Sequence, residues 1–293
     1  MQDIRTRLAR GDVILGDGAW GTLLMARGLA AGEPPELFAL TRPDVIADIA
    51  ALYLEAGAEI VTTNTFGASP LKLESFDLAD RTEEINSSAV EVVRRAVGDR
   101  AYVSASMGPT GRLLLPFGDT APARMEDAFT RQASALAGAG VDLFCVETMT
   151  DLNEAMLAVM AIRTVAPRVP ILATMTFEKT RRGFFTVMGV SIPAAARGLT
   201  SAGADMVGSN CGFGMDTMIE IAREFRQHAG VPIAIQANAG LPVTSQGVTV
   251  YPETPGDVAA KAPALLAAGV QIIGGCCGTT PDHIRALRAL IRH

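Results

Sequence analysis

Two adjacent cysteines, Cys276 and Cys277, lie in a glycine-rich run near the end of the chain. A disulfide between neighbouring cysteines strains the peptide bond that joins them, because disulfide geometry is narrow. The two sulfurs can instead bind one metal ion together, and a third cysteine, Cys211, has a similar setting before a glycine. Three thiolates with an open fourth position are typical of a zinc ion that receives a substrate. These residues predict a Zn²⁺ site formed by Cys211, Cys276 and Cys277.

The fourth cysteine, Cys145, lies inside an apolar run, two residues before Glu147. Alternation along a strand places both side chains on one face, with the sulfur one layer deeper than the carboxylate. A free cysteine in such surroundings usually behaves as a small buried hydrophobe. We therefore expect Cys145 to belong to the core and not to the metal site.

Two acidic residues, Asp17 and Glu147, stand at the ends of apolar runs. A carboxylate in such a position is costly unless it has a partner. A substrate ammonium group would serve as that partner, and an internal ion pair or a helix-cap interaction is the alternative. The backbone amides of Gly18 and Ala19, which follow Asp17, could receive a substrate carboxylate. The set predicts an amino-acid substrate for the metal site.

Polar residues also follow two other apolar runs: Asn64 and Thr65 after one, Asn238 after the other. Each is a candidate substrate ligand, and Asn238 is also a candidate for approach to the metal when substrate is absent. Bracing of a loop is the alternative for all of them. The sequence has no HExxH motif, phosphate-binding P-loop or serine nucleophile elbow, and its three histidines indicate no site.

Eight apolar runs of strand length alternate with eight helical patterns along the chain. The expected strands span residues 13–17, 59–64, 101–106, 143–147, 171–175, 206–211, 233–238 and 271–276. The expected helices span residues 43–56, 82–97, 123–139, 152–166, 193–202, 215–228, 256–268 and 281–292. This alternation predicts an α/β fold, a single (βα)8 TIM barrel, with one domain over residues 1–293.

The barrel would bring the three cysteines together, because Cys211 ends the sixth predicted strand and Cys276 and Cys277 end the eighth. The carboxyl ends of the strands carry the active site in such barrels. Long connections follow several strands, over residues 18–42, 107–122, 176–192 and 239–255. Four of the helix-to-strand turns are short and contain a glycine suited to a left-handed cap: Gly57, Gly140, Gly203 and Gly269.

Composition narrows the functional class. With 293 residues and 49% hydrophobic content, the chain can bury a large core. The net charge of -6, without a basic block, argues against nucleic acid as a partner. No apolar run reaches the roughly 20 residues of a membrane span. Four cysteines are too few for a disulfide framework in a chain of this length, which favours a reducing compartment. We therefore expect a cytoplasmic enzyme, and the absence of a long apolar run predicts no membrane partner.

Taken together, these motifs resemble the homocysteine S-methyltransferase family, which includes the homocysteine-binding domain of cobalamin-dependent methionine synthase and betaine-homocysteine methyltransferase. The matching segments are residues 17–22, 64–66, 108–111, 147–148, 210–212, 238–240 and 274–281. The resemblance implies a (βα)8 barrel in which Cys211, Cys276 and Cys277 hold Zn²⁺ and homocysteine is methylated to methionine as a zinc thiolate.

The same resemblance implies roles for residues around the zinc. Asp17 and Glu147 would hold the homocysteine amino group, and Gly18, Ala19 and Thr65 would lie near its carboxylate. A zinc-bound thiolate attacks the methyl group directly, so no general base is required.

Two differences from betaine-using relatives bear on the identity of the methyl donor. Betaine-using relatives carry a tyrosine after the phenylalanine of the second-strand motif, where this chain has Gly67, and residues 33–36 lack a tryptophan that those relatives have nearby. The pattern is more similar to the methionine synthase domain, and the sequence contains no folate or cobalamin module. We expect a separate methyl-corrinoid protein as donor, with residues 113–117 and 181–185 as candidate docking surfaces.

Three alternatives remain. A betaine or S-methylmethionine donor would keep the same reaction class. A phosphorylated substrate bound at residues 274–280 would make the protein a different barrel enzyme. A zinc scaffold would carry the metal without catalysis.

Overall fold

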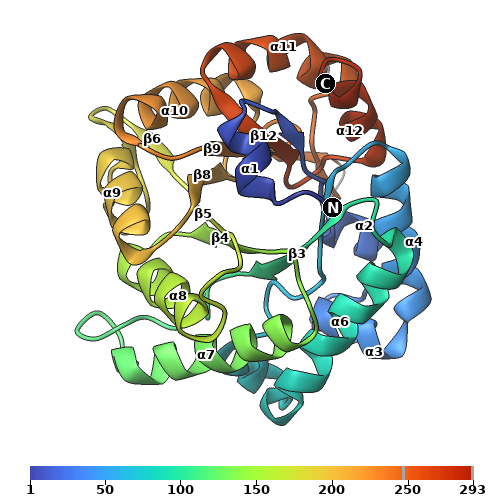
Figure 1. The fold of residues 1–293 in the computed structure, drawn as a ribbon, viewed down its shortest axis with the longest axis vertical. Coiled ribbons are helices and arrows are strands. Elements are labelled where there is room, and N and C mark those ends of the chain that lie inside the picture. Colours follow the sequence, from blue (N-terminus) through green and yellow to red (C-terminus); the bar gives the residue numbers. More distant parts are fainter. Residues whose placement is uncertain (246–247, 292–293) are drawn as a thin grey trace.

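The computed structural model describes residues 1–245 and 248–291. Eight parallel strands form a central ring, and helices surround it (Figure 1). The strand order is β1-β12-β9-β8-β5-β4-β3-β2. A parallel bridge between Gly16 and Ile60 joins the two outermost strands and closes the ring. The predicted (βα)8 barrel is confirmed.

All eight predicted strands are present, and their ends differ from the expected ones by no more than two residues. They are β1 (Ile14–Leu15), β2 (Ile60–Thr62), β3 (Tyr102–Met107), β4 (Leu143–Met149), β5 (Ile171–Met175), β8 (Met206–Asn210), β9 (Ile233–Ala237) and β12 (Val270–Gly275).

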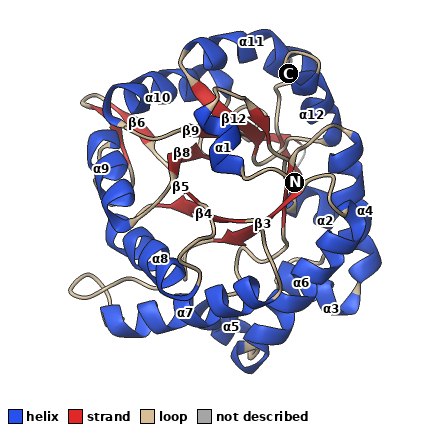
Figure 2. Cartoon of the chain, in the orientation of Figure 1, coloured by secondary structure: helices blue, strands red, loops and turns tan. Residues whose placement is uncertain are grey.

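The eight predicted helices form the outer layer (Figure 2). They are α4 (Pro43–Glu55), α6 (Thr82–Val97), α7 (Pro122–Gly138), α8 (Leu152–Val165), α9 (Ile192–Ala202), α10 (Met215–His228), α11 (Pro255–Ala267) and α12 (Pro281–Arg288). The last was expected to reach residue 292, which lies outside the described residues. It ends at Arg288, because the chain then turns to bury Ile291 in the core.

Shorter elements lie before β1 and in the connections, where no periodic pattern predicted them. The helical ones are α1 (Ile4–Ala9), α2 (Gly21–Ala26), η1 (Pro35–Leu37), α3 (Phe38–Thr41), α5 (Pro70–Leu73), η2 (Glu74–Phe76) and η3 (Ala79–Arg81). Two antiparallel hairpins follow β5 and β9: β6 (Glu178–Thr180) with β7 (Gly183–Phe185), and β10 (Val243–Ser245) with β11 (Val248–Val250).

Two layers of apolar side chains hold the barrel together. One lies between the strands and the outer helices, and the other fills the inside of the barrel at its amino-terminal end. Helix α1 covers that end, with Ile4 and Leu8 packed in the inner layer (Figure 1). Cys145 lies in the same inner layer and is 3% exposed, which confirms its prediction as core.

The helix ends follow their sequence signals. The four predicted cap glycines all have positive φ, as Gly203 (φ 113°) illustrates. At the start of α12, Thr280 N donates to His283 Nδ1 over 3.1 Å, so Thr280 and His283 cap the helix reciprocally. No helix within the described ranges is long and apolar enough to cross a bilayer.

Candidate metal and amino-acid site

The three cysteines meet at the carboxyl end of the barrel. Cys211 follows β8, and Cys276 and Cys277 follow β12. Their sulfurs all lie within 4.8 Å of one another, and the Sγ atoms of Cys211 and Cys277 are 3.8 Å apart. Tetrahedral zinc, with bonds of about 2.3 Å, separates its sulfur ligands by about 3.8 Å. The cluster therefore fits a thiolate-bound metal of this size.

Backbone contacts set this arrangement. Cys211 has φ 61°, which is uncommon for a residue with a side chain, and its amide donates to the Gln236 carbonyl over 3.1 Å. Cys276 N donates to the carbonyl of Ala237 over 2.7 Å, and Cys277 O accepts from Ala239 N over 3.0 Å. Strand β9 and the segment after it thus anchor all three cysteines.

The three thiols shift one another's pKa values. Hydrogen bonds from Cys276 and Cys277 hold the pKa of Cys211 far below that of an ordinary thiol. The reciprocal contacts, together with burial, raise the pKa of Cys276. One thiolate is therefore favoured in the cluster, and a dication would favour the others.

Asp17 lies just after β1 and is 2% exposed. Its Oδ2 accepts from Thr62 N over 2.7 Å and from Trp20 Nε1 over 2.8 Å, and its Oδ1 accepts from Thr62 Oγ1 over 2.8 Å. Burial raises the pKa of Asp17 to about 6, although these hydrogen bonds oppose the shift. These three hydrogen bonds orient the side chain.

Glu147 lies in β4 and accepts from Ser106 Oγ over 2.5 Å. Burial, reinforced by the charges of Asp17 and Cys211, raises the pKa of Glu147 to about 7. Within the described part of the chain neither Asp17 nor Glu147 forms an ion pair. The internal ion pair considered for them is therefore not found.

One cavity of about 370 Å³ contains the cysteines and both carboxylates. Among the residues predicted for the site, those that line it are Asp17, Gly18, Ala19, Asn64, Glu147, Cys211, Cys276 and Cys277. No lysine, arginine or histidine from the described ranges lines it. A bound ammonium group would therefore meet the carboxylates of Asp17, Glu36 and Glu147 and no competing side-chain cation from the described residues.

Two predicted site residues, Thr65 and Asn238, do not line the cavity, and the backbone amide of a third is already hydrogen-bonded within the protein. The buried Thr65 hydroxyl donates to the Ser106 carbonyl over 2.7 Å and does not line the cavity. Asn238 is buried beside Cys211, and its Oδ1 has no hydrogen-bond partner among the described residues. The Ala19 amide donates to Thr279 Oγ1 over 3.1 Å, so it is not free for a substrate carboxylate.

Several cavity residues were not predicted: Trp20, Glu36, Thr62, Phe66, Ser106, Gln236 and Tyr251. A strand-end position inside the barrel was the available signal for Thr62 and Ser106. Trp20 was marked only by its proximity to Asp17. Tyr251 comes from a long connection whose sequence shows no periodicity.

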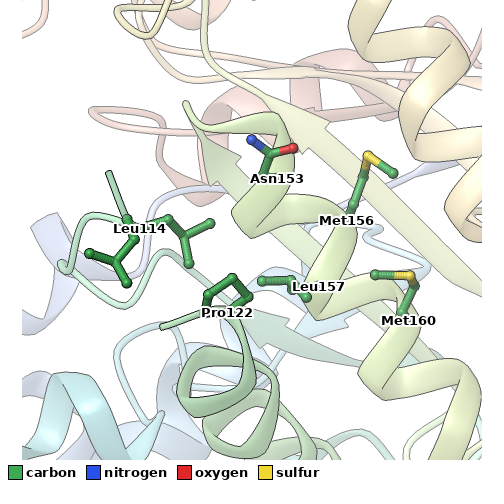
Figure 3. A pocket seen from close by; sticks show the side chains of 7 residues that line it. Leu114, Pro122, Asn153, Met156, Leu157 and Met160 are labelled. Atoms are coloured by element: carbon green, nitrogen blue, oxygen red, sulfur yellow. The ribbon is translucent and has the colours of Figure 1, made fainter. Parts of the chain in front are cut away.

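A second hollow, of about 270 Å³, lies between the connection after β3 and helices α7 and α8 (Figure 3). Its lining is mostly apolar and includes Leu115, Met156 and Met160. It contains no ionisable side chain from the described residues, so it offers no chemistry of its own.

Comparisons with known proteins identify the family of this chain. The family model of homocysteine S-methyltransferase matches residues 14–291. Methionine synthase of Mycobacterium tuberculosis is 36% identical over 296 residues, which cover 95% of this chain and 24% of that protein. Methionine synthase of Mycobacterium leprae is 36% identical over 298 residues, with the same coverage. The chain thus spans about a quarter of the length of these relatives.

Solved structures support the fold. The metallated form of the homocysteine methyltransferase MmuM from Escherichia coli has a TM-score of 0.82 and 23% identity, with 99% of this chain and 100% of that chain covered. The oxidised form of MmuM gives a TM-score of 0.81 with the same identity and coverage. By the family match over almost its whole length, this chain belongs to the homocysteine S-methyltransferase family.

Proposed function

We propose that this chain binds homocysteine and transfers a methyl group to its sulfur, giving methionine. The observation that carries this proposal is that one cavity combines a cluster of three cysteines with the carboxylates of Asp17 and Glu147, neither of which forms an ion pair among the described residues. An amino acid with a side-chain thiol can bind to both, with its sulfur at the cysteine cluster and its ammonium group at the carboxylates.

Cys211, Cys276 and Cys277 would hold Zn²⁺, with the fourth position left for the substrate sulfur. Zinc bound there would lower the pKa of the substrate thiol and keep it as a thiolate at neutral pH. The donor set favours zinc, because thiolates are soft ligands and the sulfur spacing fits tetrahedral coordination.

Asp17 and Glu147 would hold the homocysteine ammonium group. Their burial makes the charged forms unfavourable alone, and a bound cation offsets that cost. Trp20, Thr62 and Ser106 keep the two carboxylates oriented through the hydrogen bonds described above. The Gly18 amide is the proposed contact for the carboxylate end of the substrate.

Methyl transfer then requires only alignment. The substrate sulfur attacks the methyl carbon, and the new carbon–sulfur bond forms as the bond between the methyl group and its carrier breaks. The product is a neutral thioether, which is a weaker ligand than a thiolate and can leave.

A methyl-corrinoid protein is the proposed donor. At Gly67, where betaine-using relatives carry a tyrosine, an added Cβ would lie 2.7 Å from Glu36 Oε1, and that oxygen also accepts the Gly67 amide. A side chain at position 67 would therefore have to displace the Glu36 carboxylate from this hydrogen bond. The exposed Leu115 and Phe117 remain the proposed docking surface for a large donor.

The phosphate-binding alternative is less well supported. Near the paired cysteines, Gly275 N donates to Asp17 O over 2.8 Å and Thr279 N donates to Cys276 O over 3.1 Å. Amides engaged in this way cannot receive a phosphate, and the cavity has no cationic lining among the described residues.

Metal analysis and a methionine assay test the proposal together. The purified protein should contain about one zinc per chain, which Cys211→Ala removes and Cys145→Ala, the matched control in the core, retains. Homocysteine is then offered with methylcobalamin, methyl-folate, S-methylmethionine and betaine in separate assays, and methionine should form with methylcobalamin. A native protein without metal refutes the zinc site, and a zinc-bound protein inactive with every donor favours the scaffold alternative.

A further inference from the structure

Gln236 lines the cavity but has no role in the proposed function. It lies in β9, two residues after Ala234, which belongs to the inner layer of the barrel. Alternation along the strand therefore directs the Gln236 side chain into the barrel. In the sheet register Gln236 lies beside Asn210 of β8 and Gly274 of β12. The side chain is thus placed between the two strands that lead to the cysteines.

The amide group of Gln236 has no hydrogen-bond partner among the described residues. Its Oε1 is buried and accepts no hydrogen bond from them, and its Nε2 donates to none of them. Buried amide oxygens without a donor are uncommon in native proteins, and each requires an explanation. Because the oxygen is the buried end of this amide, the NH₂ group is the end that faces the cavity.

The other N–H-bearing side chains that line the cavity within the described ranges already donate to the protein. Trp20 Nε1 donates to Asp17 Oδ2 over 2.8 Å, and Asn64 Nδ2 donates to Pro35 O over 2.7 Å. No lysine, arginine or histidine of these ranges lines the cavity, so a substrate carboxylate must be received by neutral donors. A carboxylate has two oxygens, and the Gly18 amide supplies a donor for only one of them.

The position of Gln236 suits the carboxylate of an amino acid whose ammonium group lies at Asp17. A Cβ added to Gly274 would lie 3.3 Å from Gln236 Cγ and 3.2 Å from Asp17 O, so the two residues flank this glycine. The ammonium and carboxylate groups of an α-amino acid are bonded to the same carbon. A donor close to Asp17 can therefore reach the carboxylate while Asp17 holds the ammonium group.

We propose that Gln236 Nε2 donates a hydrogen bond to the carboxylate of homocysteine, and that the cavity thereby selects an α-amino acid over a simple aminothiol. This inference rests on the proposed function. Gln236 binds the substrate and takes no part in methyl transfer, so its loss should weaken only ligands that carry the carboxylate.

A pair of thiols isolates the contribution of the carboxylate. Homocysteine and 3-aminopropane-1-thiol share the thiol, the ammonium group and the spacing between them, and they differ only in the carboxylate. Calorimetric titration at pH 8 compares both ligands in zinc-loaded wild type, Gln236→Met, Gln236→Glu and Gln227→Met. Methionine keeps an unbranched side chain of similar length but has no N–H group. Gln227, exposed on α10, provides the matched control.

In Gln236→Met, affinity for homocysteine should fall about 10-fold to 150-fold, which is the loss expected for one hydrogen bond to a charged group. Affinity for 3-aminopropane-1-thiol should stay within twofold of wild type. Gln236→Glu, which keeps the shape of the side chain, should also lower the ratio of homocysteine affinity to aminothiol affinity. Zinc content should be unchanged in every variant, and Gln227→Met should match wild type.

Two results would overturn the proposal. One is a homocysteine affinity that neither Gln236 variant changes. The other is an equal loss of affinity for both thiols, because the amide would then act on the sulfur, on the ammonium group or on the shape of the cavity, and not on the carboxylate.

The titration separates this inference from the proposed function, because it measures binding and supplies no methyl donor. A wild type that binds homocysteine and shows the carboxylate-specific loss in Gln236→Met, but makes no methionine with any donor, refutes only the proposed function. Methionine formation by a wild type whose Gln236 variants keep full homocysteine affinity refutes only the inference. A wild type that binds neither thiol refutes both.

Discussion

Replacing Glu147 by glutamine should make the protein more stable and its binding of homocysteine weaker. Burial, with smaller contributions from the charges of Asp17 and Cys211, raises the pKa of Glu147 from 4.5 to about 7. One pKa unit corresponds to about 1.4 kcal/mol, so keeping this carboxylate ionised in the empty cavity costs about 3 kcal/mol. Glutamine keeps the shape of the side chain without that cost.

The sign of the effect depends on pH. Because the folded pKa of Glu147 lies above the unfolded value of 4.5, its favourable contribution is complete below pH 4.5 and is lost as pH rises through about 7. Glu147→Gln and wild type should therefore differ little at pH 5. At pH 8 the variant should be more stable by up to about 3 kcal/mol.

Binding should change in the opposite direction. A hydrogen bond between a carboxylate and an ammonium group contributes about 1.5 to 3 kcal/mol, so homocysteine affinity at pH 8 should fall about 10-fold to 150-fold. The same substitution would thus stabilise the empty protein and weaken its complex.

Urea denaturation at pH 5 and pH 8, with calorimetric titration of homocysteine at pH 8, measures both effects. Glu91→Gln, on the exposed face of α6, is the matched control and should change neither quantity. The reasoning fails if Glu147→Gln shows the same stability difference from wild type at both pH values, or if homocysteine affinity stays within twofold of wild type.

Three further predictions follow. Methionine carries the ammonium group but no ionisable thiol. Its affinity should fall at least about tenfold between pH 8 and pH 5.5, because Glu147 and then Asp17 take up protons over this range. Calorimetry measures this affinity, and a value that does not change with pH contradicts the role of the two carboxylates. Gly278→Ala should destabilise the protein by about 1 to 3 kcal/mol in urea denaturation, because Gly278 has φ 78° and the new methyl group would overlap Tyr251. An unchanged midpoint of urea unfolding contradicts this packing. Cys145→Ser should retain one zinc per chain by elemental analysis, and its loss would place Cys145 in the metal site.

The barrel itself could be predicted because its signals are local. Apolar runs of strand length mark the strands, helical periodicity marks the outer helices, and glycines such as Gly203 mark the helix ends. The (βα)8 topology then predicted which residues would meet in space, which their spacing in the sequence does not show. Cys211 and Cys276 are far apart in sequence, yet parallel strands end on the same rim.

The support around the site could not be predicted, because it depends on contacts between distant segments. Thr62 donates twice to Asp17 from 45 positions away, and nothing in the sequence pairs the two residues. Thr65 was placed at the substrate because it follows a strand, but its hydroxyl turns toward the Ser106 carbonyl of the next strand. Side-chain direction after a strand end depends on such hydrogen bonds and not on alternation.

X-ray absorption at the zinc edge tests the central claim most directly. The cysteine cluster should show three sulfur ligands at about 2.3 Å in the zinc-loaded protein and four after homocysteine is added. Glu147→Gln should need a higher homocysteine concentration to reach the same four-sulfur spectrum. A spectrum that homocysteine leaves unchanged, in a protein that still holds zinc, would contradict the claim that this cavity receives the substrate sulfur.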